Sequence, residues 1–224
     1  MKGFILVIGL LFMASCNNQQ AETEPAEDST ETEIVYDEPQ APNFEIHFPE
    51  LSNFLSSSDS SFNTNRFTVG EVISQDTTAP VNVEKGSLQT YYPYFVFNSD
   101  STKALDLVSY NFIETTRKGK TKFDFAGPDT EIGIVDIKSQ TRKRILFLGS
   151  SGIVLDGKWA DNNTVILVGA EDAGDGNLHP LMWRYHLDTY ELEVFSYPGT
   201  IKASANEYYE RKYNNKNDKR VRSV

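Results

Sequence analysis

Serine, histidine and acidic side chains are the first candidates for chemistry in this sequence. Gly149-Ser150-Ser151-Gly152 comes close to the G-x-S-x-G turn that presents a nucleophilic serine, but it is one residue short and lacks a strand–turn–helix context. The histidines at 47, 179 and 186 lack the close spacing of metal ligands. We therefore interpret the serine run as a tight hairpin connection, and His47, His179 and His186 as surface or strand residues. We expect no catalytic residue, no cofactor and no metal.

The acidic loop over 171–177 gathers oxygen atoms of the kind that Ca²⁺ prefers. Asp172, Asp175 and Asn177 would supply the ligands. Their spacing is not that of an EF-hand, so the favoured interpretation is a plain acidic hairpin loop, with a calcium site as the alternative. Calcium that raises the melting temperature of the wild type, but not of a chain with both aspartates changed to alanine, would support the alternative.

Aromatic side chains offer a second kind of chemistry, because their faces could stack on sugars or on partner side chains. The candidates are the run 91–95, Trp159, Trp183 and Tyr185. Since alternation along a strand turns every second side chain inward, core packing is favoured for them. Paired carboxylates for glycoside hydrolysis cannot be recognised here, because their separation is a property of the fold.

The only cysteine, Cys16, follows a charged start and a short apolar run over 3–14. Met13-Ala14-Ser15-Cys16 resembles the lipobox of bacterial lipoproteins. The resemblance implies that residues 1–15 are a signal peptide, that Cys16 becomes a lipid-modified N-terminus, and that the mature protein is anchored in the bacterial cell envelope by acyl chains such as palmitate. Asn17 is not the aspartate that retains such proteins at the inner membrane in some bacteria, which favours the outer membrane. The alternative is an ordinary secretory signal cleaved near Ala14.

The acidic segment that follows predicts a stalk. Residues 17–43 carry eight acidic and no basic side chains and few apolar ones, so they cannot offset their ordering entropy by burial. We expect a lipidated N-terminus and disordered stalk over 16–43. No later stretch has the roughly 20 apolar residues that a spanning helix needs. The formal net charge of −11 excludes general nucleic-acid binding.

From residue 44 to 200, short apolar runs separated by turn residues predict an antiparallel β domain. The clearest strands are expected at 94–97, 104–114, 121–125, 131–137, 144–149, 154–160, 164–171, 181–187 and 190–197. They fall into two similar units, and over 94–197 they resemble blades of a β-propeller, which implies four-stranded meanders. A closed propeller needs at least four blades, and residues 44–93 leave room for one more. The expected fold is therefore an all-β meander or sandwich of blade-like units, with a partial propeller as the alternative.

The C-terminal residues 201–224 predict a short helix and a basic tail. Ser204 and Glu207 have the spacing of a capping box, and the helix should end near Tyr213. Beyond it the sequence has no apolar face to bury. The tail bases, counted from Lys212 onward, could attract anionic lipid headgroups, but a solvated tail is favoured.

Taken together, these features favour a membrane-anchored envelope lipoprotein with a non-enzymatic binding module for an envelope protein or a glycan. A glycan-acting hydrolase of the cell envelope is the first alternative. A subunit of an oligomeric, propeller-like assembly is the second. The sequence does not fix the oligomeric state.

Overall fold

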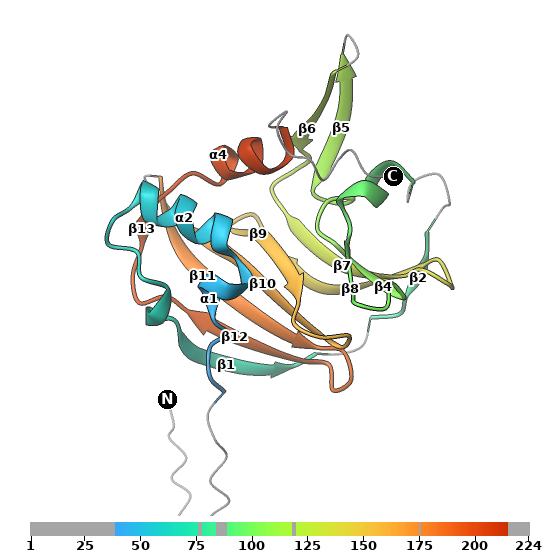
Figure 1. The fold of residues 1–224 in the computed structure, drawn as a ribbon, viewed down its shortest axis with the longest axis horizontal. Coiled ribbons are helices and arrows are strands. Elements are labelled where there is room, and N and C mark those ends of the chain that lie inside the picture. Colours follow the sequence, from blue (N-terminus) through green and yellow to red (C-terminus); the bar gives the residue numbers. More distant parts are fainter. Residues whose placement is uncertain (1–38, 76–77, 84–88, 118–119, 175, 215–224) are drawn as a thin grey trace, which may run out of the picture. The chain divides into compact units, whose positions relative to one another are not determined.

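The computed structural model describes residues 39–75, 78–83, 89–117, 120–174 and 176–214, and nearly half of them lie in antiparallel strands (Figure 1). The predicted all-β fold is confirmed. The strands are β1 (Thr68–Ser74), β2 (Val81–Asn82), β3 (Val96–Phe97), β4 (Lys103–Asp106), β5 (Phe112–Arg117), β6 (Lys120–Phe125), β7 (Thr130–Asp136), β8 (Thr141–Leu148), β9 (Gly152–Trp159), β10 (Thr164–Gly174), β11 (Asn177–His186), β12 (Glu191–Ser196) and β13 (Ile201–Lys202).

Two sheets repeat the same arrangement. The first sheet has the order β2-β8-β7-β4-β3 and the second β1-β12-β11-β10-β9, with β13 added to one end of β11. Each is a four-stranded antiparallel meander with one earlier strand on its outer edge, so the predicted blade-like units are confirmed. The two earlier strands, β1 and β2, make equivalent contacts just beyond their ends. The amide of Gln75 donates to the turn carbonyl of Tyr190, and the amide of Val83 donates to that of Gln140, at 3.0 Å in both cases.

The strand predicted over 104–114 is wrong in its extent. β4 ends at Asp106, whose carboxylate accepts hydrogen bonds from the amides of Val108 (3.0 Å) and Ser109 (2.8 Å) and so turns the chain out of the sheet. The following strand, β5, pairs only with β6 among the described strands. This hairpin is an insertion within the first unit, and it stands out from both sheets in Figure 1.

The predicted hairpin at Gly149-Ser150-Ser151-Gly152 is also wrong, although the turn itself is tight. The amide of Gly152 donates to the carbonyl of Gly149 at 2.9 Å. The strands on either side, β8 and β9, belong to different sheets and do not pair. The turn therefore connects the two blade-like units.

Two helices, separated at Phe48, lie within residues 44–58, where the sequence predicts short strands. α1 (Phe44–His47) begins with the Asn43 side chain accepting from the amide of Ile46 at 3.0 Å. α2 (Pro49–Ser58) has proline in its first turn and buries Leu51, Phe54 and Leu55 on one face. Since β1 and β2 join the two existing sheets, the described part of 44–93 contains no third unit. The described residues also include three short helical turns, η1 (Thr64–Arg66), η2 (Tyr92–Tyr94) and η3 (Glu210–Asn214), and the helix α4 (Ala205–Tyr209).

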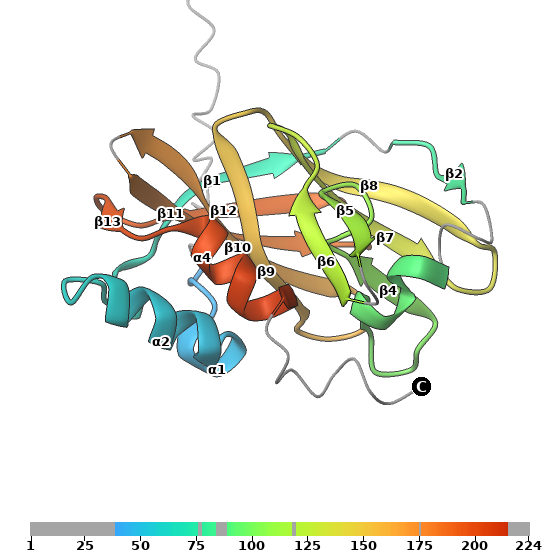
Figure 2. The same cartoon turned by 90° about the horizontal axis from the view of Figure 1, so that it is seen from above.

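The predicted short C-terminal helix is confirmed as α4, which continues into the π-helical η3. The Ser204 hydroxyl accepts from the amide of Glu207 at 3.3 Å, as expected of the cap. Phe54 of α2 and Tyr208 of α4 pack with their ring centroids 5.4 Å apart, and Figure 2 shows the two helices near one another beside β9. None of the helices within the described ranges is long and apolar enough to cross a bilayer.

The two sheets share one apolar core. The side chains of Leu167, from the second sheet, and Leu105, from the first, meet at Gly157 of β9. A Cβ at 157 would lie 2.7 Å and 2.8 Å from their methyl groups, so this close packing requires glycine. The indole of Trp159 donates to the carbonyl of Val96 at 2.7 Å and so links β9 to β3. The first strands of the two units are thereby held together.

Candidate functional site

A cavity of about 340 Å³ opens beside β3 and β9, the first strands of the two units. Its walls are largely aromatic and apolar, and a few charged side chains reach into them. The aromatic and apolar residues include Phe48, Tyr94, Phe95, Phe97, Leu107 and Tyr213, and the charged ones are Glu50, Asp156, Lys158 and Lys212. An apolar pocket with a few convergent polar groups is the usual form of a small-molecule site.

Asp156 is the polar centre of this cavity, and protein donors occupy both of its carboxylate oxygens. Its Oδ1 lies 2.6 Å from the ammonium of Lys212 and accepts from the amide of Gly157 at 2.7 Å, while Oδ2 accepts from the hydroxyl of Tyr208 at 2.8 Å. Only 16% of the Asp156 side chain and 11% of the Lys212 side chain are exposed. Burial alone would raise the pKa of Asp156, but the Lys212 charge and these hydrogen bonds together hold it below its ordinary value.

A β-bulge brings Asp156 to this position. Asp156 pairs with Val168 and Val154 with Gly169, so Leu155 is the extra residue in β9. The carbonyl of Leu155 accepts from Lys212 at 3.3 Å, and the buried hydroxyl of Tyr209 donates to the carbonyl of Val154 at 2.9 Å. The C-terminal helix thus covers the edge of β9 with side-chain hydrogen bonds, and the prediction that Lys212 belongs to a solvated tail is wrong.

A second hollow, of about 270 Å³, lies between the two sheets. Its residues come from both units: Lys103, Asp136 and Lys143 from the first sheet, and Asp188 and Tyr190 from the β11–β12 turn of the second. We call it the inter-sheet groove.

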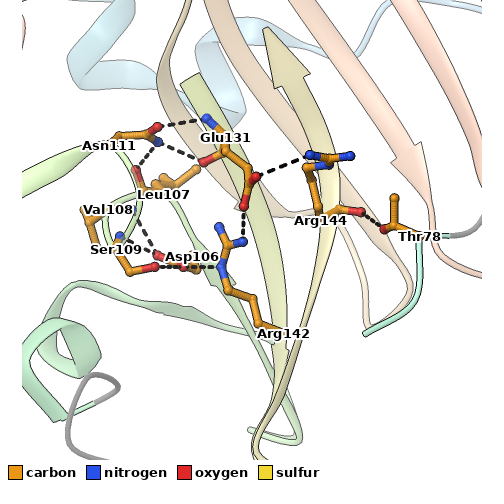
Figure 3. Close-up of polar contacts among 9 residues, drawn as sticks. All are labelled: Thr78, Asp106, Leu107, Val108, Ser109, Asn111, Glu131, Arg142 and Arg144. Carbon is orange, nitrogen blue, oxygen red and sulfur yellow. Dashed lines mark hydrogen bonds and ion pairs between the residues drawn. The ribbon is translucent and has the colours of Figure 1, made fainter. Parts of the chain in front are cut away.

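A buried ion network occupies the first sheet (Figure 3). Asp106 has no exposed surface and accepts from Arg142 Nε at 2.7 Å, while Arg142 also contacts Glu131, which lies 3.6 Å from Arg144. The guanidinium of Arg142 lies over Gly133, where a Cβ would be 2.5 Å from Cζ. Within the described residues, Nη2 of Arg142 is the one buried side-chain nitrogen or oxygen without a hydrogen-bond partner.

This network connects β4, β7 and β8 and has no free carboxylate for chemistry. The Asp106 carboxylate accepts hydrogen bonds from Arg142, from the Ser109 hydroxyl and from two backbone amides. The side chain of Asn111 donates to the carbonyl of Glu131 at 3.0 Å and accepts from its amide at 2.8 Å. We assign this ion network a structural role.

The structure does not bring the histidines together in one site. His47 lies in α1, and its pKa is lowered by burial and by the nearby charge of Lys158. His179 and His186 are at opposite ends of β11, where they face the carbonyl of Tyr197 (2.8 Å) and Glu193 (3.6 Å). No group of three or more histidine, cysteine or acidic side chains in the described part of the chain is placed to hold a metal ion.

The acidic loop connects β10 and β11, and Asp175 lies outside the described residues. The Asp172 carboxylate accepts from the amide of Gly174 at 2.9 Å, and Asn177 begins β11. Gly174 and Gly176 have φ values of 82° and 74°, which explains the two glycines of this turn. The calcium hypothesis stays open, as does lipidation at Cys16, which also lies outside the described residues.

The predicted aromatic residues divide between core and surface. Trp183 and Tyr185 are buried, Trp159 is partly buried and Tyr92 is exposed. The cavity around Asp156 was not predicted. Its signal was an acidic residue inside the apolar run VLDGKWA, but nothing in the sequence shows that Lys212 and Tyr208 would meet it.

A scan of protein-family models, a search of curated proteins and a search of solved structures found no match to this chain.

Proposed function

We propose that this chain is a lipid-anchored protein of the bacterial cell envelope, attached through Cys16 to the outer membrane, and that its β domain is a binding module. The lipobox-like Met13-Ala14-Ser15-Cys16 and the acidic sequence that follows it support the anchor. The stalk predicted over 17–43 lies outside the described residues up to 38, and at its end Gln40 accepts from Arg184 and Asn43 caps α1. The aromatic-walled cavity beside β3 and β9 supports the binding role.

The single observation that favours binding over hydrolysis is the engagement of Asp156. A general acid or base needs an accessible oxygen and a pKa near the working pH. Both oxygens of Asp156 are occupied, and its pKa is lowered. A glycan hydrolase using this cavity would have Glu50 and Asp156 as its two carboxylates. Because Asp156 holds the C-terminal helix against β9, we assign it a structural role, which is to support the cavity wall.

The anchor is tested in cells by labelled palmitate and by membrane fractionation of Cys16→Ala. We expect the wild type to incorporate label and sediment with outer membranes. The variant should take up no label and should leave the membrane fraction. A variant that stays membrane-bound, or a wild type without label, would contradict the proposed anchor.

The binding role is tested by a photo-crosslinking amino acid placed at Phe97, which lines the cavity, in native membranes. The matched control carries it at Tyr110, which is 44% exposed and does not line the cavity. We expect a discrete adduct from position 97 only. Cleavage of envelope glycans by the purified full-length chain, abolished in Asp156→Asn, would instead establish the hydrolase.

A further inference from the structure

The inter-sheet groove is a composite of equivalent parts of the two units. Its first wall is the face of β4, β7 and β8 that carries Lys103, Asp136 and Lys143. Its second wall contains Asn163, after β9, and the turn residues Asp188 and Tyr190. Ile134, Ile145, Tyr185 and Leu187 make the apolar part of the lining. Neither unit alone would form this groove.

Hydrogen-bond donors and acceptors alternate across the groove. Asn163 accepts from the ammonium of Lys103 at 3.4 Å and donates to Asp188 Oδ2 at 3.1 Å. Asp136 contributes a second carboxylate, whose Oδ1 accepts from the amide of Ser139 at 2.7 Å. The lining contains two lysines and two aspartates, so its formal charges cancel. The groove therefore offers both donors and acceptors to a ligand, and its formal charges favour neither a cation nor an anion.

Tyr190 supplies an aromatic ring at the edge of the groove, in a backbone conformation that a bulky side chain rarely adopts. Its φ is 59°, and 36% of the residue is exposed. The ammonium of Lys143 lies 3.8 Å from the ring centroid. The equivalent turn of the first sheet has Gln140 at φ 55°, so the conformation belongs to the turn and the aromatic ring is particular to position 190.

We propose that the inter-sheet groove is a binding site for a neutral saccharide. Sugar hydroxyls donate to carboxylates such as those of Asp136 and Asp188 and accept from groups such as Lys103 and Asn163. The apolar C–H face of a sugar ring packs against an aromatic side chain such as Tyr190. This site is separate from the cavity beside β3 and β9, and it does not depend on the function proposed for that cavity.

The test measures binding of neutral hexasaccharides of glucose, mannose and xylose to the full-length chain in detergent by calorimetry, with oligogalacturonate as the acidic comparison. Tyr190→Gly removes the ring and relieves the positive φ, so this variant should fold at least as well as the wild type. Gln140→Gly makes the same backbone change in the equivalent turn outside the groove, and Asp188→Asn removes one carboxylate.

We expect at least one neutral hexasaccharide to bind, with an affinity that falls about tenfold or more in Tyr190→Gly and in Asp188→Asn and is unchanged in Gln140→Gly. Absence of binding by every neutral sugar at millimolar concentration would overturn the proposal. So would preference for oligogalacturonate, or binding that survives both groove substitutions.

Discussion

At the scale of single residues, the Arg142–Asp106 and Asp156–Lys212 ion pairs are both buried and have different surroundings. Arg142 reaches Asp106 across the backbone of β7, and this path is open only because residue 133 is glycine. Asp156 and Lys212 join a strand to the C-terminal helix at the cavity wall. Removing one partner of a buried pair leaves an uncompensated charge, so each pair constrains the residues around it.

Gly133→Ala tests the path of Arg142. The added Cβ would lie 2.5 Å from Cζ and 2.7 Å from Nε, so the guanidinium would have to leave Asp106 or the strand would have to shift. We expect the free energy of unfolding, measured with urea, to fall by about 2–4 kcal/mol. Gly127→Ala is the control, because a Cβ added at 127 would have no atom within 4 Å, and it should change stability by about 0.5 kcal/mol or less. Equal effects of the two substitutions would refute this account.

The Asp156–Lys212 pair predicts a dependence of stability on pH. A carboxyl group with a lower pKa in the folded chain contributes stability that is present above its unfolded pKa of about 3.9 and is lost as the pH falls through the folded value. Asp156→Asn should therefore be less stable than the wild type at pH 7, and this difference should narrow below about pH 4. Urea unfolding of both proteins at pH 7 and pH 3 measures it. A difference that stays constant would show that Asp156 keeps an ordinary pKa.

At the scale of elements, the C-terminal helix protects a strand edge. The first strand of an open sheet presents unpaired backbone groups that invite association. Along β9, Tyr209 and Lys212 donate to the carbonyls of Val154 and Leu155. The helix contributes these bonds through side chains, where a further strand would contribute them through its backbone.

Tyr209→Phe tests this arrangement, because it removes the hydroxyl and keeps the ring. The carbonyl of Val154 loses a bond that is buried, so we expect a loss of about 1–2 kcal/mol in the free energy of unfolding. Tyr110→Phe, at a residue 44% exposed, should have an effect within about 0.5 kcal/mol. If both variants unfold at the wild-type urea concentration, the edge is not stabilised by this bond.

At the scale of the whole molecule, the two sheets are joined by contacts between their first strands and by a shared core. Asn162, between β9 and β10, accepts from the hydroxyl (2.7 Å) and the amide (3.2 Å) of Ser99, between β3 and β4. The Trp159 indole adds its bond to Val96. The groove and the cavity both depend on these contacts, since residues of both sheets line each of them.

Trp159→Phe should weaken this association while leaving each sheet intact. We expect a loss of about 1–3 kcal/mol, from the hydrogen bond and the smaller ring, with a single unfolding transition and an unchanged urea m-value. Circular dichroism and tryptophan fluorescence, read from the remaining Trp183, should give coincident curves. Two separated transitions would mean that the sheets fold independently.

The local pattern of this sequence determined the strands of the two units, the tight turns between them and the cap of the C-terminal helix. Alternation and turn residues are properties of neighbouring positions, so they can be read without a fold. The same reasoning missed α1 and α2, although Pro49 and the spacing of Leu51, Phe54 and Leu55 carried a helix signal. The sequence pattern also predicts one continuous strand where the structure has β4 and β5, because the turn between them depends on the buried carboxylate of Asp106.

Only the tertiary structure decided which side chains meet. Asp156 and Lys212 are far apart in the sequence, and so are Lys103 and Asn163, and neither pair belongs to a recognisable motif. Their proximity follows from the packing of one sheet against the other and of a helix against a strand edge, which are long-range contacts that no local pattern encodes. The lipobox-like run at Cys16 has the opposite character, because its pattern consists of neighbouring residues and can be recognised without a fold.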